Sequence, residues 1–115
     1  MQYSGWSLLD HMIAALNLIS EFMQSTPTKE NFIENKLVSR AVTMELFNFA
    51  ELVKKTSEDG TLPGNMYPWR EIIKFRDKMG HWYFTTNFGL IYDIVVNHLP
   101  PVADYLKQQQ QQLKP

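Results

Sequence analysis

Cysteine is absent from this chain of 115 residues. Disulfide bonds, thiolate nucleophiles and thiolate metal ligands are therefore excluded, and the compartment is left open on redox grounds. Long apolar runs are also lacking: none approaches the roughly 18 residues of a membrane span, and the start of the chain has no basic stretch leading into an apolar core. We therefore expect a cytoplasmic protein that does not contact membranes.

An excess of charge of either sign is missing as well, since the formal net charge is −1 at pH 7. Such a chain has no general attraction for nucleic acid, which argues against a DNA-coating role, and we expect no DNA partner. Any RNA contact has to come from a local cluster of cations. The candidate cluster contains Lys74, Arg76 and Lys78, with Arg70 nearby.

Apolar residues recur at three- and four-residue spacing along most of the chain, which is typical of amphipathic helices. No period-two apolar run is backed by β-branched residues, so we expect an all-α fold. At 13.5 kDa the chain has room for one core. We expect one domain over residues 1–107 and a Gln-rich tail over 108–115. The expected helices are 7–23, a short helix ending near 34, 36–55, 68–83, one that follows 85–87, and one that starts at Pro100 and Pro101.

Turn-forming residues separate these helices. Pro27 stops the first helix and fits the first turn of the next, and Thr26 is the expected cap of that short helix. Residues 56–67 contain two glycines and a proline and are expected to form an ordered loop. Asn87 and the threonines before it are possible caps of the helix that follows them.

The helix expected over residues 36–55 is apolar on nearly all sides. In so small a chain, one subunit has difficulty burying every side of a helix, so we expect a second copy to cover part of it in a homodimer. Glu45 lies on the apolar stripe of this helix. It either reaches water at an edge or needs a partner if it is buried.

The stretch 69–83 concentrates more reactive groups than any other. On an ideal helix Arg76 and Tyr83, seven residues apart, share a stripe, whereas His81 points about 140° away from Arg76. Asp77 lies four residues before His81, on the same face, where its carboxylate can orient the imidazole. For the two groups to act together, the long side chain of Arg76 has to extend toward His81, or a second subunit has to supply the guanidinium.

An imidazole and a guanidinium are the minimum needed to cut RNA without a metal. The ribose 2′-hydroxyl attacks the adjacent phosphate, the histidine moves protons, and the arginine stabilises the charge that develops. Trp82 and its aromatic neighbours suit stacking on unpaired bases, and Lys74 and Lys78 suit contacts with the RNA backbone. Spacing alone also permits a structural or solvated His81 and tryptophans that belong to the core.

The remaining histidines, His11 and His98, have no acidic cluster nearby and are interpreted as structural. No two histidines stand at helical ligand spacing, and no His-Glu-x-x-His pattern occurs. We therefore expect no metal site and no cofactor.

The run Arg76-Asp77-Lys78-Met79-Gly80-His81-Trp82-Tyr83 resembles the R-x4-H-x-Y motif of the HepT-like toxins of the HEPN superfamily. The segment ahead of it, residues 68–73, and the segment 97–101 (Asn-His-Leu-Pro-Pro) resemble two further family segments in the same order. The resemblance covers about residues 8–106.

This resemblance implies an up-and-down bundle of about four to five helices that dimerises around a shared cleft. It implies a metal-independent endoribonuclease with Arg76 and His81 as the catalytic pair. It also implies a toxin-antitoxin system, in which an antitoxin nucleotidyltransferase of the MNT type adds AMP to Tyr83. The resemblance further implies that the protein forms a homodimer or a higher assembly with this antitoxin. A bulky anionic adduct there would occupy the phosphate site beside Arg76.

The chain departs from the family pattern at several positions. Asp77 replaces the usual asparagine, Asn48 and Phe49 stand where a Gly-Glu pair is expected, and Tyr92 replaces a frequent tryptophan. Two rival functions therefore remain beside the ribonuclease. One is a helical binding or regulatory module that keeps the nucleotidyltransferase partner but cuts nothing, and the other is a nucleotide-binding subunit in which Arg76 anchors phosphate.

Overall fold

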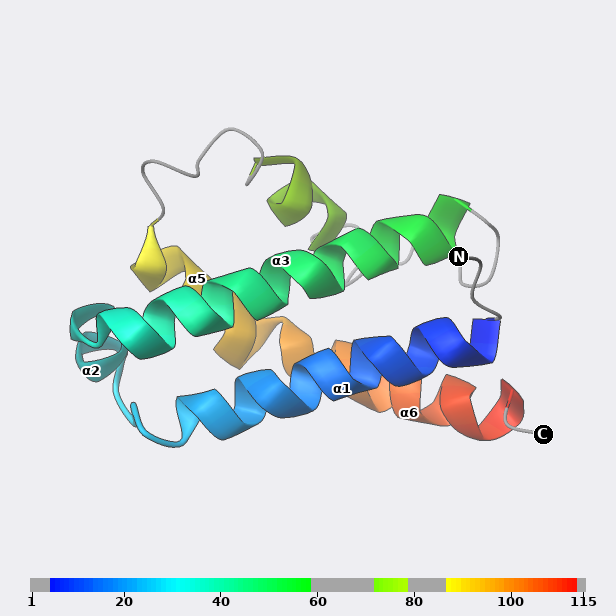
Figure 1. Ribbon diagram of the computed structural model, residues 1–115, viewed down its shortest axis with the longest axis horizontal. Coiled ribbons are helices and arrows are strands. Elements are labelled where there is room, and N and C mark those ends of the chain that lie inside the picture. The colour runs from blue at the N-terminus through cyan, green and yellow to red at the C-terminus, as the bar shows by residue number, and fades with distance from the viewer. Residues whose placement is uncertain (1–4, 59–71, 79–86, 114–115) are drawn as a thin grey trace.

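The computed structural model describes residues 5–58, 72–78 and 87–113, and nearly all of them are helical (Figure 1). No strand occurs in these ranges, so the predicted all-α fold is confirmed. The helices are α1 (Gly5–Met23), α2 (Lys29–Glu34), α3 (Lys36–Glu58), α5 (Phe88–Asn97) and α6 (Leu99–Leu113), together with the helical segment 72–78.

The helices pack as a bundle around α1 and α3, which lie side by side and run in opposite directions (Figure 1). α1 packs against α3 on one side and against α6 on the other. α5 runs behind α3 and contacts α2, α3 and α6. An ion pair between Lys29 Nζ and Asp93 Oδ2, 3.0 Å apart, further ties α2 to α5.

One hydrophobic core joins these elements. α1 contributes residues at the three- and four-residue spacing of one helical stripe, which is why the periodicity of the sequence predicted a helix there. The fully buried core side chains include Leu9, Met12, Phe32, Val42, Leu46, Phe49, Ile72, Val102 and Leu106.

The structure corrects the expected start of the second helix. α2 begins at Lys29, and its N-cap is Thr28, whose hydroxyl accepts from the backbone N–H of Asn31 at 3.1 Å. Thr26 instead is buried and donates its hydroxyl to the carbonyl of Met23 at 3.4 Å. Its hydroxyl thus serves the end of α1, and Pro27 precedes the helix rather than opening it.

The later boundaries are closer to prediction. Asn87 caps α5 as expected, accepting from the backbone N–H of Leu90 at 3.1 Å, and both prolines stand in the first turn of α6. α3 continues three residues past its predicted end. In this last stretch Thr56 is buried and donates its hydroxyl to the carbonyl of Val53 at 2.9 Å. The predicted loop at 56–67 is therefore helical as far as Glu58.

The residues predicted to form a tail extend α6 as far as Leu113. Gln110 donates from Nε2 to Oδ1 of Asp10 on α1 at 2.6 Å. The Gln-rich residues 108–112, which their composition predicts as frayed or solvent-exposed helix, are thus a continuation of α6. Of the helix expected over 68–83, the structure describes residues 72–78, and these are helical.

Candidate active site

Arg76 is carried on a short helical segment that the core holds in place. In segment 72–78 the side chains of Ile72 and Phe75 are 0% and 4% exposed and belong to the core. Burying an apolar side chain of this kind contributes about 1.5–3 kcal/mol. The segment is therefore anchored through one face, and Arg76, the residue after Phe75, extends toward α3.

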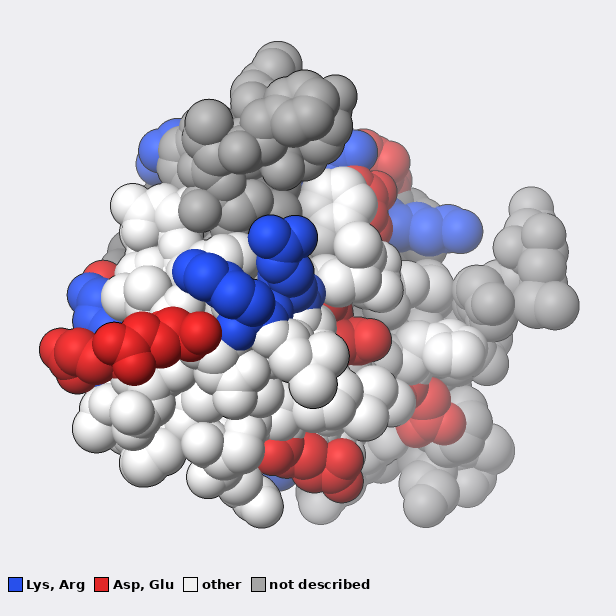
Figure 2. Space-filling view, turned by 60° about the vertical axis from the view of Figure 1, so that its left-hand side comes forward, with Lys and Arg blue, Asp and Glu red and all other residues white. Residues whose placement is uncertain are grey.

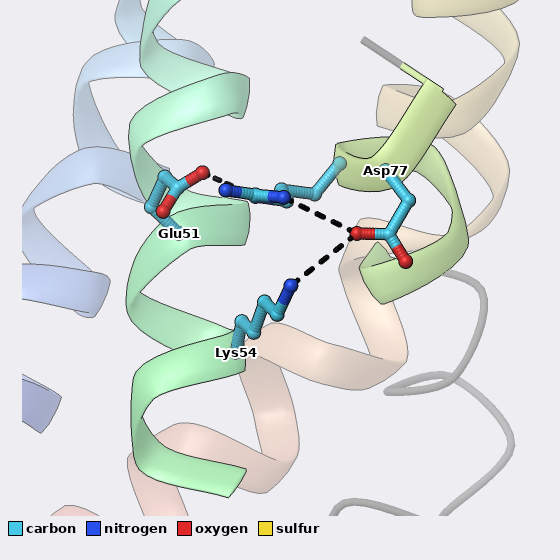
Figure 3. A network of polar contacts seen from close by, with 4 residues as sticks. Glu51, Lys54 and Asp77 are labelled. Atoms are coloured by element: carbon cyan, nitrogen blue, oxygen red, sulfur yellow. Dashed lines mark hydrogen bonds and ion pairs between the residues drawn. The ribbon is translucent and has the colours of Figure 1, made fainter. Parts of the chain in front are cut away.

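Two carboxylates hold the guanidinium of Arg76 (Figure 3). Nε donates to Glu51 on α3, and Nη1 donates to Oδ1 of Asp77 at 3.3 Å. Lys54, also on α3, places Nζ 3.6 Å from the same oxygen of Asp77. The network thus links α3 to segment 72–78 with two positive and two negative groups.

These contacts further favour the charged form of Arg76, which a guanidinium already adopts at neutral pH. The hydrogen bond to Glu51, followed by the charge of that carboxylate and the contact with Asp77, raises the pKa of Arg76 above its ordinary value. A guanidinium in this state binds anions but does not donate protons to a substrate. The Arg76 side chain is 30% exposed, and the contacts with Glu51 and Asp77 use two of its five N–H groups.

Arg76 opens onto a surface groove along α3. One pocket, of about 450 Å³, is lined by Glu51, Leu52, Lys54, Lys55, Glu58 and Arg76. A second pocket, of about 430 Å³, lies between α1 and α3 and is lined by His11, Ala14, Ala15, Leu18, Glu45, Asn48, Glu51 and Leu52. The two pockets share Glu51 and Leu52, and we call them together the α3 groove.

Glu45, for which the sequence left two interpretations, is half-buried in this groove. Its carboxylate therefore lies beside an open pocket rather than inside the core. This placement agrees with the interpretation that Glu45 reaches water at an edge of the helix.

Asp77 has two described partners, Arg76 and Lys54. The sequence predicted that Asp77 orients His81, and that role stays a prediction, because His81 lies outside the described residues. Trp69, Trp82 and Tyr83 also lie outside them. Of the predicted site, the structure places Arg76 and Asp77 together.

The other predicted RNA contacts lie on a different side of the segment. Lys74 and Lys78 line a pocket with residues of α5 and with His98, whereas Arg76 lines the α3 groove. The three cations of the predicted cluster therefore do not form one patch.

Glu51 and Lys54 were not singled out from the sequence. They stand 25 and 22 residues before Arg76, so no local spacing indicates the contact. The family pattern did predict an acid on this helix, but at the Asn48-Phe49 pair. In the structure Phe49 is fully buried, and Glu51, two residues later, supplies the carboxylate beside Arg76.

Charge on the face shown in Figure 2 is mixed, with lysine and arginine side chains beside aspartate and glutamate. No single-sign surface spreads over that face, so recognition of an anion has to rest on particular side chains. Among the described residues, no three histidine or acidic side chains gather closely enough to hold a metal ion. The helices described here are too short or too polar for any of them to cross a membrane.

Comparison of the sequence with known proteins identifies a family. The model of the "Ribonuclease HepT-like" family matches residues 12–109. A protein of Thermococcus cleftensis named "Probable ribonuclease HepT" is 29% identical over 87% of this chain and 90% of its own length. A protein of Caldanaerobacter subterraneus named "Putative RNase TTE0752" is 26% identical over 87% of this chain and 88% of its own length.

A further relative from Methanocaldococcus jannaschii, named "Putative RNase MJ0127", is 36% identical over 64% of this chain. The match spans 60% of the length of that relative. No solved structure matches the chain significantly.

Proposed function

Because the chain belongs to the HepT-like ribonuclease family, we propose that it is a metal-independent endoribonuclease whose catalytic pair is Arg76 and His81. The observation that carries this proposal is the position of the Arg76 guanidinium at the surface. Its guanidinium is charged, partly exposed and held at Nε by Glu51 at the edge of an open groove. A planar cation held in this way suits a phosphate group.

The proposed reaction needs no group beyond RNA and these side chains. The ribose O2′ attacks the adjacent phosphorus and loses its proton to a base, and the bond from phosphorus to O5′ breaks as O5′ takes up a proton. The products are a 2′,3′-cyclic phosphate and a 5′-hydroxyl. His81 transfers the protons, and Arg76 stabilises the extra charge on the phosphate oxygens in the transition state.

The proposed active form is a homodimer in which the second copy covers the α3 groove. Leu18 on α1 lines the groove and is 39% exposed. Leu37 and Met44 on α3 are 82% and 58% exposed, and helical spacing puts both on the side of α3 that carries Asn48 of the groove. The pocket beside Leu18 adjoins the pocket of Arg76. A partner seated there would bury these side chains and bring its own reactive groups toward Arg76, which would resolve the angle of about 140° between Arg76 and His81.

We further propose that the protein is the toxin of a toxin-antitoxin pair and that an MNT-type nucleotidyltransferase silences it through Tyr83. The phenol oxygen gives up its proton to a base and attacks the α-phosphorus of ATP, pyrophosphate leaves, and AMP stays attached to the ring. On helical spacing Tyr83 follows Arg76 by two turns, so the added phosphate would pair with the guanidinium that binds RNA. Intact mass after incubation with the partner and ATP should rise by one or more AMP groups and should stay unchanged in Tyr83→Phe.

The contact between Asp77 and Arg76 favours a second candidate function. A carboxylate on Nη1 already occupies part of the guanidinium, as expected of a binding or regulatory module that cuts nothing. This module would keep the nucleotidyltransferase partner but show no nuclease activity.

One experiment separates the two functions. The purified chain is incubated with RNA in EDTA, and fragments are resolved beside those from Arg76→Ala and His81→Ala. We expect cleavage by the natural chain, losses of at least a hundredfold in both variants, and full activity in Lys107→Ala, which removes an exposed cation from α6. Cleavage that persists unchanged in His81→Ala and Arg76→Ala would exclude the proposed catalytic pair.

A further inference from the structure

Asp77 places one anionic oxygen between two cations that come from different elements. Its Oδ1 lies 3.3 Å from Nη1 of Arg76 and 3.6 Å from Nζ of Lys54 on α3. Figure 3 shows both contacts meeting at this single oxygen, while Glu51 accepts from Nε of Arg76. A guanidinium and an ammonium group therefore converge on the same anion.

Lys54 is placed by α3 and not by the segment that carries Arg76. It follows Glu51 by three residues, so the two side chains emerge from neighbouring positions on one face of the helix. Both line the pocket of Arg76, which has a volume of about 450 Å³. The helix face that holds the guanidinium thus also supplies a second cation to the pocket.

The contact between Lys54 and Asp77 is one that an incoming anion can replace. At 3.6 Å it is longer than a hydrogen bond, and the two side chains are 35% and 56% exposed. Ion pairs between exposed groups contribute little to stability, because water competes for both charges. The carboxylate of Asp77 can therefore leave this position at little cost.

From this geometry we propose that Lys54 is a second phosphate-binding residue of the active site, and that a phosphate of the RNA strand takes the position of the Asp77 carboxylate. The inference rests on the proposed ribonuclease function, which supplies the strand. One phosphate oxygen accepts from Nη1 of Arg76, and Lys54 pairs with the same oxygen or its neighbour. A phosphodiester carries one negative charge, as the carboxylate does, so it can satisfy both cations.

The position of Lys54 also matters for the reaction. When the ribose oxygen attacks, the phosphate gains a second negative charge in the transition state. Two cations that contact the phosphate stabilise this extra charge more than they stabilise the bound substrate. Loss of Lys54 should therefore lower kcat as well as affinity.

Binding is tested with a fluorescent oligoribonucleotide whose 2′-hydroxyls are methylated, because it lacks the attacking group and cannot be cut. Anisotropy titrations over a range of salt concentrations compare the natural chain with Lys54→Gln and Lys54→Arg. The control is Lys107→Gln, which removes an exposed lysine from α6. A thermal melt checks that each variant is folded.

Salt dependence gives the readout. One phosphate contact on a single strand contributes about 0.7 to the slope of log affinity against log salt, so Lys54→Gln should lose about 0.7 from that slope. This loss corresponds to roughly fivefold weaker binding at about 0.1 M salt and to equal binding near 1 M. Lys54→Arg keeps a cation and should keep the natural slope, as should Lys107→Gln.

A second background separates phosphate binding from a structural role. If Lys54 only neutralises Asp77, then Asp77→Asn/Lys54→Gln should bind the strand as Asp77→Asn does. If Lys54 binds phosphate, the double variant should bind about fivefold more weakly than Asp77→Asn at about 0.1 M salt. Equal binding by these two variants, or a slope in Lys54→Gln equal to that of Lys107→Gln, would overturn the proposal.

Cleavage of unmodified RNA is measured separately. Lys54→Gln should lower kcat/KM by more than about fivefold, since it loses both affinity and transition-state stabilisation. If the natural chain cuts no RNA, the ribonuclease proposal fails, whereas a slope that depends on Lys54 would still support the phosphate contact. A natural chain that does not bind the methylated strand at low salt would overturn the phosphate contact itself.

Discussion

Replacing Asp77 by asparagine should strengthen RNA binding. Asp77 places a carboxylate oxygen 3.3 Å from Nη1 of Arg76 and 3.6 Å from Nζ of Lys54, in the region where a substrate phosphate would approach the guanidinium. Asparagine keeps an oxygen that can accept the hydrogen bond from Nη1 of Arg76 but removes the negative charge. The substitution therefore tests charge with little change of shape.

The expected size follows from the exposure of the site. The Asp77 side chain is 56% exposed, so a water-like dielectric applies. Two unit charges about 5 Å apart in water repel each other by an amount that corresponds to roughly a fourfold change in an equilibrium constant. We expect KM for RNA to fall about fourfold at low salt and the gain to disappear near 1 M salt, where the screening length is about 3 Å.

The assay is the initial rate of cleavage of a fluorescent RNA at several salt concentrations. The matched control is Asp104→Asn, which makes the same chemical change at an exposed position of α6. The reasoning is refuted if Asp77→Asn behaves like this control. A fall in kcat with unchanged KM would also refute it and would instead support the predicted role of Asp77 in orienting His81.

Three further outcomes are expected. Met44→Asp places a charge in the proposed interface, so it should shift the protein from dimer to monomer in sedimentation at micromolar concentration and lower its activity. The control Gln111→Asp on α6 should change neither the dimer nor the activity. A natural chain that is already monomeric would contradict the dimer. Phe75→Ala should lower the free energy of unfolding in urea by about 3–5 kcal/mol, because Phe75 is 4% exposed and anchors segment 72–78, and an unchanged midpoint would show that the segment is not packed as described. Burial raises the pKa of Tyr105. The unfolded chain therefore releases the phenol proton at lower pH than the folded chain, and the stability of the fold should decrease as pH rises above about 10. Over that range the melting temperature of Tyr105→Phe should decline less than that of the natural chain, and an equal decline would argue against a raised pKa of Tyr105.

Local patterns predicted most of the fold. Periodic apolar residues indicated α1 and α3, and Asn87 and the proline pair marked the beginnings of α5 and α6, because caps and helical stripes depend on neighbours within four residues. The cap of α2 was wrong by two positions. Both positions hold a threonine, so the sequence does not distinguish the two caps. In the folded turn the hydroxyl of Thr26 donates to the carbonyl of Met23 at the end of α1, and the hydroxyl of Thr28 caps α2.

The sequence by itself determined the all-α class, the motif around Arg76 and the candidate reactive groups, since these follow from residue type and short spacing. Tertiary structure decided which groups meet. Glu51 and Lys54 reach Arg76 and Asp77 because α3 packs beside segment 72–78, and Lys74 and Lys78 face α5 and His98 instead. Helical geometry sets the side on which each residue emerges, but the neighbour on that side comes from a distant part of the chain, and only packing brings it there.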